Sequence, residues 1–360
     1  MRIIFTGGGT VGHVSPAIAI AEEFAERYPN SEMLFVGREG GAENEIVKGT
    51  GMKVEALRIR GLERKITARN FLAVRDAVRS RSAAKKIIQE FNADIVVGTG
   101  GYVCWPVISA ARSMGIFTVM HESNAVLGLT SRLLFKKVDL CLLGQNIAQK
   151  GAEFVGNPIR KSFGSIDRRS ARSTLGLGQQ DLLIVSVGGS IGAQKLNDAC
   201  IELMRTYSQK NKRVHHIHSC GRRYYGEIEK ELGAMKDGRC KAVPYISDMP
   251  AYLHAADLVI SRCGAMTLSE IGFCGTPSVL IPSPNVTNDH QRKNAEQFLR
   301  SGASLVIEEK DLDSEALRTS VDKILSDRNK RIRMSKCAKN CIEEHAASKC
   351  VDAIMERFTK

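Results

Sequence analysis

Two glycine-rich loops contain the residues of this chain that are most typical of phosphate chemistry. The first loop covers residues 7–13 (GGGTVGH) after the apolar run 3–5, and the second covers residues 188–193 (GGSIGA) after the apolar run 182–187. Glycine lets the backbone approach a ligand closely, and a helix that starts behind the loop offers unpaired N–H groups and the positive end of its dipole. Two such loops about half a chain apart predict two Rossmann-like halves and a ligand that carries a diphosphate.

The elements around these loops follow one pattern along the whole chain. Short apolar runs alternate with amphipathic stretches, which is typical of βαβ units in parallel sheets. The apolar runs predict strands near residues 3–5, 33–36, 54–59, 95–97, 117–120, 140–143, 182–187, 214–218, 241–243, 258–261, 278–281 and 305–307. Helices are expected near residues 16–28, 71–91, 106–114, 289–300 and 314–325, with one long helix over 331–358. The predicted fold class is α/β, with two Rossmann-like domains that face each other across a cleft.

The domain organisation follows from the place where this alternation of strands and helices is interrupted. We expect an N-terminal domain over residues 1–157, a C-terminal domain over 158–330, and a final helix over 331–360 that packs back on the N-terminal domain. The boundary is placed at residues 155–160 (VGNPIR), where glycine and an Asn-Pro pair interrupt the regular alternation. A chain of 360 residues, 43% of them hydrophobic, is long enough for each domain to bury its own core.

The composition narrows the classes of partner. A formal net charge of +13 favours acidic partners such as an anionic membrane surface or a phosphorylated substrate, whereas 6% aromatic residues leave little material for stacking bases, so no nucleic acid is expected. No apolar run reaches the ~20 residues that span a bilayer, and no secretory signal opens the chain. The ten cysteines include no Cys-x-x-Cys pair, which favours reduced thiols in the cytoplasm over a zinc or disulfide framework.

Polar and glycine-rich residues follow most of the predicted strands. Because ligands of open parallel sheets bind at the carboxyl ends of the strands, these segments are the candidates for a substrate site. They are residues 10–13, 98–102, 121–124, Ser190, 245–248, 262–270 and 288–291.

Two motifs admit other enzyme classes. Gly7, Gly9 and Gly12 satisfy the dinucleotide fingerprint, but the second predicted strand ends in Arg38 where an NAD enzyme has an acidic residue, so only an NADP oxidoreductase stays open. The second loop satisfies the G-x-S-x-G pattern of hydrolases, yet it opens a second domain rather than lying within one central sheet. A phosphate or nucleotide loop is the better interpretation of both.

Metal-binding patterns are weak. Asp311 and Asp313 form a D-x-D pair, but helix capping before the stretch 314–325 explains them more simply. His121-Glu122 lacks the second histidine of a zinc-protease helix. We therefore predict no metal and no cofactor.

The polar segments, taken together and in order, resemble one enzyme family. The segments are 7–13, 121–125, 156–160, 189–193, 264–270 and 289–295. They are similar to those of glycosyltransferase family 28, the bacterial transferases that add N-acetylglucosamine to undecaprenyl-diphosphate-linked N-acetylmuramoyl-pentapeptide, and the likeness covers nearly the whole chain. The resemblance implies the two-domain GT-B fold, with UDP-N-acetylglucosamine (UDP-GlcNAc) on the second domain and the lipid acceptor on the first.

The resemblance also implies an activity. It would be the inverting, metal-independent transfer of N-acetylglucosamine to the 4-hydroxyl of the lipid-linked acceptor, converting lipid I to lipid II in peptidoglycan synthesis, and so serving cell wall biogenesis, cell shape and cell division. The enzyme would be peripheral, at the cytoplasmic face of the cell membrane. Two alternatives stay open, a UDP-GlcNAc 2-epimerase-like GT-B isomerase and a non-catalytic sugar-nucleotide binding module.

Carried onto this sequence, the resemblance implies a set of residues that contact UDP-GlcNAc. They are Thr10, Val11, Gly12, Asn124, Arg160, Ser190, Ile246, Ala265, Met266, Thr267, Leu268, Ser269, Glu270 and Gln291. Ser190 would face the diphosphate and Arg160 would add positive charge. The backbone of Ile246 would contact uracil, Glu270 the ribose hydroxyls, and Gln291 the sugar hydroxyls.

Three candidates have an ordinary alternative of equal weight. Asn124 could equally serve only to cap the helix that follows it. His13 is the candidate catalytic base because imidazole titrates near neutral pH, but it could equally cap a helix or bind the acceptor. The predicted helix 71–91 mixes apolar residues with a row of arginines and lysines, which fits either an anionic lipid surface or a core helix with a basic solvated face.

Overall fold

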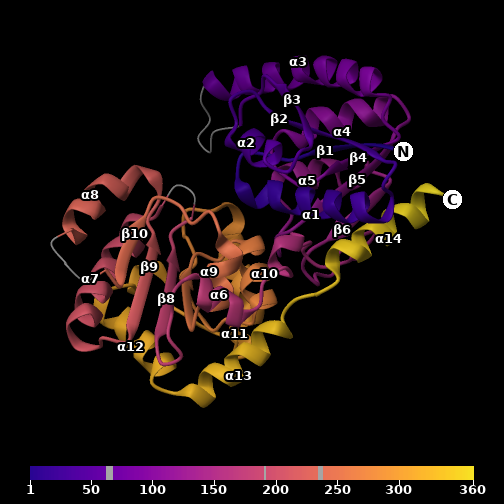
Figure 1. Ribbon diagram of the computed structural model, residues 1–360. Helices are drawn as coiled ribbons and strands as arrows, with labels where there is room; N and C mark the ends of the chain where they lie inside the picture. Colours follow the sequence, from indigo (N-terminus) through magenta and orange to yellow (C-terminus); the bar gives the residue numbers. More distant parts are fainter. Residues whose placement is uncertain (62–67, 190–191, 234–237) are drawn as a thin grey trace. The chain divides into compact units, whose positions relative to one another are not determined.

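The computed structural model describes residues 1–61, 68–189, 192–233 and 238–360 (Figure 1). The chain divides into two compact units. The first unit comprises residues 1–161 and 343–360, and the second comprises residues 162–342. Ser190 and Ile191 lie outside the described residues.

The first unit is built on a parallel sheet of seven strands in the order β3-β2-β1-β4-β5-β6-β7. The strands are β1 (Arg2–Thr6), β2 (Glu32–Arg38), β3 (Lys53–Leu57), β4 (Ile95–Gly98), β5 (Phe117–Glu122), β6 (Leu140–Leu143) and β7 (Glu153–Phe154). The helices are α1 (Val11–Arg27), α2 (Ala42–Lys48), α3 (Ala68–Phe91), α4 (Cys104–Ser113), α5 (Leu129–Leu134) and α14 (Ala346–Phe358).

Both faces of this sheet are covered by helices. Ile3 and Phe5 of β1 pack into one core with α1, α2 and α14, whereas Ile4 packs into the other core with α3, α4 and α5. Helix α14 lies alongside α1 (Figure 1). A strand that is buried on both faces is mostly apolar, which is why residues 3–5 form a continuous hydrophobic run.

The second unit repeats the plan with a parallel sheet of six strands in the order β10-β9-β8-β11-β12-β13. The strands are β8 (Leu182–Val187), β9 (Val214–Ser219), β10 (Cys240–Val243), β11 (Leu258–Ser261), β12 (Ser278–Leu280) and β13 (Ser304–Val306). The α-helices are α6 (Arg168–Thr174), α7 (Gln194–Lys210), α8 (Arg222–Leu232), α9 (Met249–Ala255), α10 (Ala265–Cys274), α11 (His290–Arg300), α12 (Ser314–Leu325) and α13 (Arg328–Lys339). Short 3₁₀ turns occupy Lys161–Phe163, Thr287–Asp289 and Glu309–Asp311.

The predicted α/β class with two Rossmann-like domains is confirmed, and two helix predictions are corrected. Helix α1 begins at Val11 rather than at residue 16, so that Gly12 and His13 lie in its first turn. The long helix expected over 331–358 is two helices, α13 and α14. Between them, Ile342 packs over Gly272 of the second unit and Glu343 packs over Gly156 of the first, so the chain leaves one unit for the other where a continuous helix was expected.

Among the residues that the structure describes, no helix has the length and apolar character needed to cross a bilayer.

Candidate active site

The candidate residues of each unit lie at the carboxyl edge of its sheet. In the first unit the order of strands reverses between β1 and β4, and in the second between β8 and β11. Loops diverge at such a reversal and leave a crevice in which ligands bind. The first glycine loop follows β1 and the second follows β8, so each loop borders the crevice of its own unit.

The first glycine loop is held against the loop that follows β4. Gly8 N–H donates to Gly100 O over 3.3 Å, and the Thr99 hydroxyl donates to the carbonyl oxygen of His13 over 2.6 Å. Gly101 has a φ of +84°, and a Cβ at this position would collide with the carbonyl oxygen of Gly8. Glycine is therefore required here both for the backbone conformation and for the close approach.

His13 is presented in the tautomer that a general base needs. Its Nδ1 lies 3.1 Å from the carbonyl oxygen of Gly8, and because a carbonyl oxygen only accepts, Nδ1 carries the proton. The other ring nitrogen, Nε2, is then left with a free lone pair. The side chain is half-buried in the first turn of α1, where Thr10 is the exposed residue before the helix and Val11 and Gly12 open it. First-turn amides have no partner within the helix.

Asn124 lies on a loop that is organised by the buried carboxylate of Glu122. The two carboxylate oxygens accept from Asn124 N (3.0 Å), Asn124 Nδ2 (2.9 Å), Gly128 N (2.9 Å) and the Ser131 hydroxyl (2.6 Å). Burial alone would raise the pKa of Glu122, but the hydrogen bonds from Ser131, Gly128 and Asn124 outweigh it and lower the pKa. An ionised Glu122 thus fixes both the backbone and the amide of Asn124.

Two further side chains lie at this edge: Glu43, which the sequence analysis missed, and Tyr102, which belongs to the candidate segment 98–102. Glu43, on α2, is 5% exposed, and its Oε1 has no hydrogen-bond partner among the described residues and lies 2.8 Å from the position of a Cβ on Gly8. The ring of Tyr102 packs against Gly9, and burial raises the pKa of its hydroxyl. Helix α2 has only seven residues and was not predicted, so no local pattern pointed to Glu43.

The described ends of the second glycine loop are held by the end of β9. Gly188 N–H donates to Ser219 O over 3.1 Å. Gly192 has a φ of +80°, and a Cβ on it would collide with the carbonyl oxygen of Cys220. Ser190, the residue predicted to face a diphosphate, lies between these two anchors and outside the described residues. The backbone on either side of it is thus positioned by β9 and the residue after it, and the contact of Gly192 is one that only glycine permits.

Gln291 ties three segments of the second unit together. Its Oε1 accepts from the backbone N–H of Cys263 (3.1 Å) and from that of Ser283 (2.9 Å). Asn294, one helical turn later, donates to the carbonyl oxygen of Cys263 over 3.1 Å. The amide oxygen of Gln291 is thereby occupied, and the side chain has its two Nε2 hydrogens to offer a ligand.

The remaining predicted residues are distributed as follows. Ile246 is buried in the loop after β10, and residues 265–270 form the first turns of α10, where Thr267 and Glu270 are half-buried and Ala265, Met266, Leu268 and Ser269 are buried. Arg160 belongs to the first unit, and its buried Nε has no hydrogen-bond partner among the described residues. The sheet edges therefore gather residues 10–13 and Asn124 in the first unit, and Ile246, 265–270 and Gln291 in the second.

The patterns considered for metals have structural roles. Asp313 caps α12 by accepting from Ala316 N over 2.7 Å, as predicted. His121 is a core residue that donates from Nε2 to Gly156 O over 3.0 Å, and burial lowers its pKa. In the described part of the chain no three histidine, cysteine or acidic side chains come together as metal ligands.

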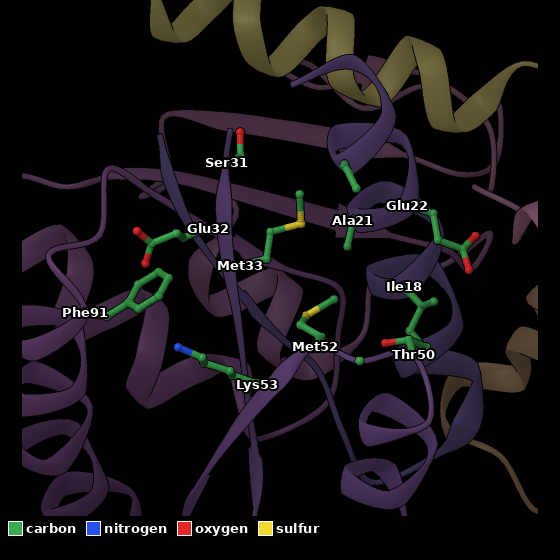
Figure 2. A pocket seen from close by; sticks show the side chains of 12 residues that line it. Ile18, Ala21, Glu22, Ser31, Glu32, Met33, Thr50, Met52, Lys53 and Phe91 are labelled. Carbon is green, nitrogen blue, oxygen red and sulfur yellow. The ribbon is translucent and has the colours of Figure 1, made fainter. Parts of the chain in front are cut away.

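A cavity of about 370 Å³ lies in the first unit, away from the candidate residues (Figure 2). Its lining comes from one side of α1, the amino-terminal ends of β2 and β3, and the end of α3. Met33 and Met52 form its apolar floor, with Glu22, Glu32 and Lys53 around them. None of the predicted site residues lines this cavity, because it opens at the amino ends of strands whose carboxyl ends carry the site.

Two Rossmann-like units, each with a glycine loop at its crevice, are the architecture of GT-B glycosyltransferases, and the protein is an enzyme of this class. The family model described as the glycosyltransferase family 28 N-terminal domain matches residues 3–142, and that described as the family 28 C-terminal domain matches residues 183–352. The chain belongs to glycosyltransferase family 28.

Relatives of known name agree along the full length. A UDP-N-acetylglucosamine–N-acetylmuramyl-(pentapeptide) pyrophosphoryl-undecaprenol N-acetylglucosamine transferase of Acetivibrio thermocellus is 38% identical over 362 residues, covering 99% of this chain and 98% of the relative. A protein of the same name from Bacillus cytotoxicus is 37% identical over the whole of both chains. The crystal structure of Acinetobacter baumannii MurG superposes with a TM-score of 0.74 at 25% identity, covering 99% of each chain.

The likeness of this chain to UDP-GlcNAc 2-epimerases is a likeness of fold alone. A putative UDP-N-acetylglucosamine 2-epimerase from Listeria monocytogenes superposes with a TM-score of 0.70 over 99% of this chain and 96% of that one, but at 12% identity.

Proposed function

We propose that this enzyme transfers N-acetylglucosamine from UDP-GlcNAc to the 4-hydroxyl of undecaprenyl-diphosphate-linked N-acetylmuramoyl-pentapeptide, which is the step from lipid I to lipid II in peptidoglycan synthesis. The observation that carries the proposal is the sequence identity of 37–38%, along nearly the full length of both chains, with relatives that bear the name of this transferase. It is supported by the polar side chains at the carboxyl edge of each sheet.

The donor site is assigned to the second unit. The amides at the second glycine loop and Ser190 receive the diphosphate, because amides at the start of a helix stabilise anions. The loop of Ile246 receives uracil, and Thr267 and Glu270 at the start of α10 are the side chains of residues 265–270 that reach the ribose. Gln291 donates from Nε2 to a sugar hydroxyl, since its oxygen already accepts two backbone bonds.

The acceptor site is assigned to the first unit, with His13 as the base. The acceptor O4 attacks the anomeric carbon, the bond from that carbon to the diphosphate oxygen breaks, and the electron pair leaves with UDP. Nε2 of His13 takes the proton of the 4-hydroxyl as the new bond forms. Helix amides and the guanidinium of Arg160 stabilise the departing diphosphate, so the reaction needs no metal, and one displacement inverts the anomeric centre.

An exposed surface on α3 and α5 is assigned to the anionic membrane. Val74 and Val78 of α3 are 55% and 59% exposed, and Leu129 and Leu133 of α5 are exposed to nearly the same degree. Both helices pack on α4. The basic residues on these two helices and just after them are Arg69, Arg75, Arg79, Arg81, Lys85, Lys86, Arg132, Lys136 and Lys137. The side chains of Phe71 and Leu72, which were part of the prediction, lie outside the described residues.

Apolar side chains among basic ones suit a protein that rests on an anionic leaflet. The enzyme would therefore be peripheral, at the cytoplasmic face where its nucleotide donor is found. Sedimentation with anionic vesicles tests this assignment. The wild type should pellet at low salt and less at high salt, and V74S/V78S should pellet less than the control L299S, which changes an exposed leucine of the second unit. No binding at low salt would contradict it.

The activity itself is tested by measuring UDP release with and without the lipid-linked acceptor. Transfer requires the acceptor and yields a β-linked disaccharide that NMR can identify, whereas an epimerase interconverts the sugar nucleotide without it. Turnover should survive a chelator such as EDTA. UDP-GlcNAc binding without turnover on any acceptor would identify a binding module instead.

A further inference from the structure

A chain of hydrogen bonds runs through the interior of the second unit beneath the second glycine loop. Its members are Ser186 on β8, His216 and His218 on β9, and Asn197 on α7, and all four are 0% exposed. The Ser186 hydroxyl lies 2.7 Å from His216 Nε2 and 2.7 Å from His218 Nδ1. His218 Nε2 lies 3.0 Å from Asn197 Oδ1, and Asn197 Nδ2 donates to Cys220 O over 3.1 Å.

The direction of every proton in this chain follows from its last member. Cys220 O can only accept, so the amide nitrogen of Asn197 faces it and the amide oxygen faces His218. His218 therefore donates from Nε2 and has a bare Nδ1, which accepts the proton of the Ser186 hydroxyl. The Ser186 oxygen then accepts from Nε2 of His216. With both imidazoles neutral, this arrangement of protons makes all four bonds.

This arrangement requires both imidazoles to be neutral. Burial lowers the pKa of His218 to about 4, and burial together with the neighbouring His218 lowers the pKa of His216 well below its ordinary value. At neutral pH the rings therefore carry no charge. The four bonds tie Ser186, both rings and Asn197 together, and Nδ1 of His216 is left buried without a hydrogen-bond partner among the described residues.

The chain ends on the two described anchors of the glycine loop. Asn197 stands in the first turn of α7, and its Oδ1 lies 3.3 Å from the position of a Cβ on Gly188. Cys220 O, which receives the last bond, is the oxygen against which Gly192 packs. A shift of Asn197 or of Cys220 O would therefore move the backbone on both sides of Ser190.

We propose that Ser186, His216 and His218 are positioning residues for the nucleotide donor. Through Asn197 they hold the carbonyl of Cys220, and with it Gly188 and Gly192, in the arrangement that receives the diphosphate of a uridine nucleotide. This role rests on the donor site proposed above. None of the three side chains touches the ligand, and their effect falls on donor binding and not on the chemical step.

The test uses the full-length enzyme and UDP as the probe. S186A breaks the chain at its centre, and S278A is the matched control, because Ser278 is a buried serine of the same sheet whose hydroxyl has no hydrogen-bond partner among the described residues. We expect S186A to raise the calorimetric Kd for UDP and the KM for UDP-GlcNAc about tenfold, with kcat at saturating donor within about twofold of the wild type. S278A should leave all three unchanged.

A second pair of variants separates positioning from simple stability. Glutamine at position 218 can still donate an N–H toward Asn197, whereas leucine cannot, so H218Q should retain more affinity for UDP than H218L even where their melting temperatures agree. Equal affinity for UDP in the wild type, S186A and H218L would overturn the proposal. It would also be overturned if S186A and S278A both lost affinity for UDP in proportion to their loss of stability. If the wild type itself does not bind UDP, the donor site is wrong, and the proposed function fails with it.

Discussion

The two glycine loops have similar sequences but different surroundings. Behind the first loop, the carboxyl group of Glu43 lies against Gly8, and His13 donates to the carbonyl oxygen of the same residue. Behind the second loop lie a neutral amide and a neutral imidazole, Asn197 and His218. An anion is repelled by an acidic side chain and tolerated by neutral ones. The comparison matches the roles we propose for the two loops: an acidic side chain packs against the loop assigned to proton transfer, and neutral side chains pack against the loop assigned to the diphosphate.

The largest expected effect concerns the first loop. H13A should lower kcat by about 10²- to 10⁴-fold and leave the Kd for UDP unchanged, because the base acts only on the acceptor hydroxyl. Steady-state kinetics with both substrates saturating, together with calorimetry, measure this. H254A is the control, since His254 of the second unit also has a ring nitrogen bonded to a backbone carbonyl, that of Phe163. A kcat near the wild-type value in H13A would exclude His13 as the base.

A matched pair of glycine substitutions tests the division of labour between the loops. Gly101 and Gly192 both have positive φ, and a Cβ on either would collide with a backbone carbonyl oxygen. G101A should displace the first loop and lower kcat at least about tenfold while UDP still binds, and G192A should raise the Kd for UDP at least about tenfold. Both kcat and the Kd for UDP must be measured for each of the two variants. If both variants lose the same parameter, the two loops do not have separate functions.

A smaller effect is expected from the carboxylate below Asn124. E122Q replaces an acceptor of four hydrogen bonds by a group that must turn an N–H toward one of its donors, at a cost of about 1–3 kcal/mol in stability. We expect kcat to fall and the Kd for UDP to stay constant. D139N is the control, because Asp139 is a carboxylate that accepts from Thr118 at the opposite end of β5. A transfer rate in E122Q equal to that of D139N would argue against the role of Glu122 in placing Asn124.

The smallest effect on catalysis is expected for the last prediction, which concerns only how the stability of the protein depends on pH through His218. The pKa of His218 is about 4 in the folded protein and ordinarily 6.5, so the unfolded chain binds more protons between these values. Its contribution is complete above pH 6.5, and about 3 kcal/mol is lost as the pH falls toward 4. Urea unfolding at about pH 7 and about pH 5 measures the part of this loss that falls above pH 5, which is about 2 kcal/mol. H218Q should lose less stability than the wild type over this pH interval. An equal loss in the two proteins would show that other groups cause the pH dependence.

The strands were predictable because their signal is local. The apolar runs 182–187 and 258–261 are buried on both faces, and the structure gives them the same bounds, β8 and β11. The break between the last two helices was not predictable, because residues 331–358 have helical composition throughout. It is the packing over Gly272 and Gly156 that separates α13 from α14. Helix α2 was missed because its seven residues are too few for a clear helical pattern, and Glu43 was missed with it.

The sequence by itself determined the two α/β halves, the place of both glycine loops after buried strands, and the resemblance to family 28, because each depends on the order and spacing of residues along the chain. Only the tertiary structure decided that His13 keeps its proton on Nδ1, that Glu122 holds Asn124, and that Ser186 links two imidazoles to Asn197. Each of these is a hydrogen bond whose protons are set by partners from other elements of the fold. A pattern of residue types contains no information on which partner a side chain meets, and that partner sets its chemistry.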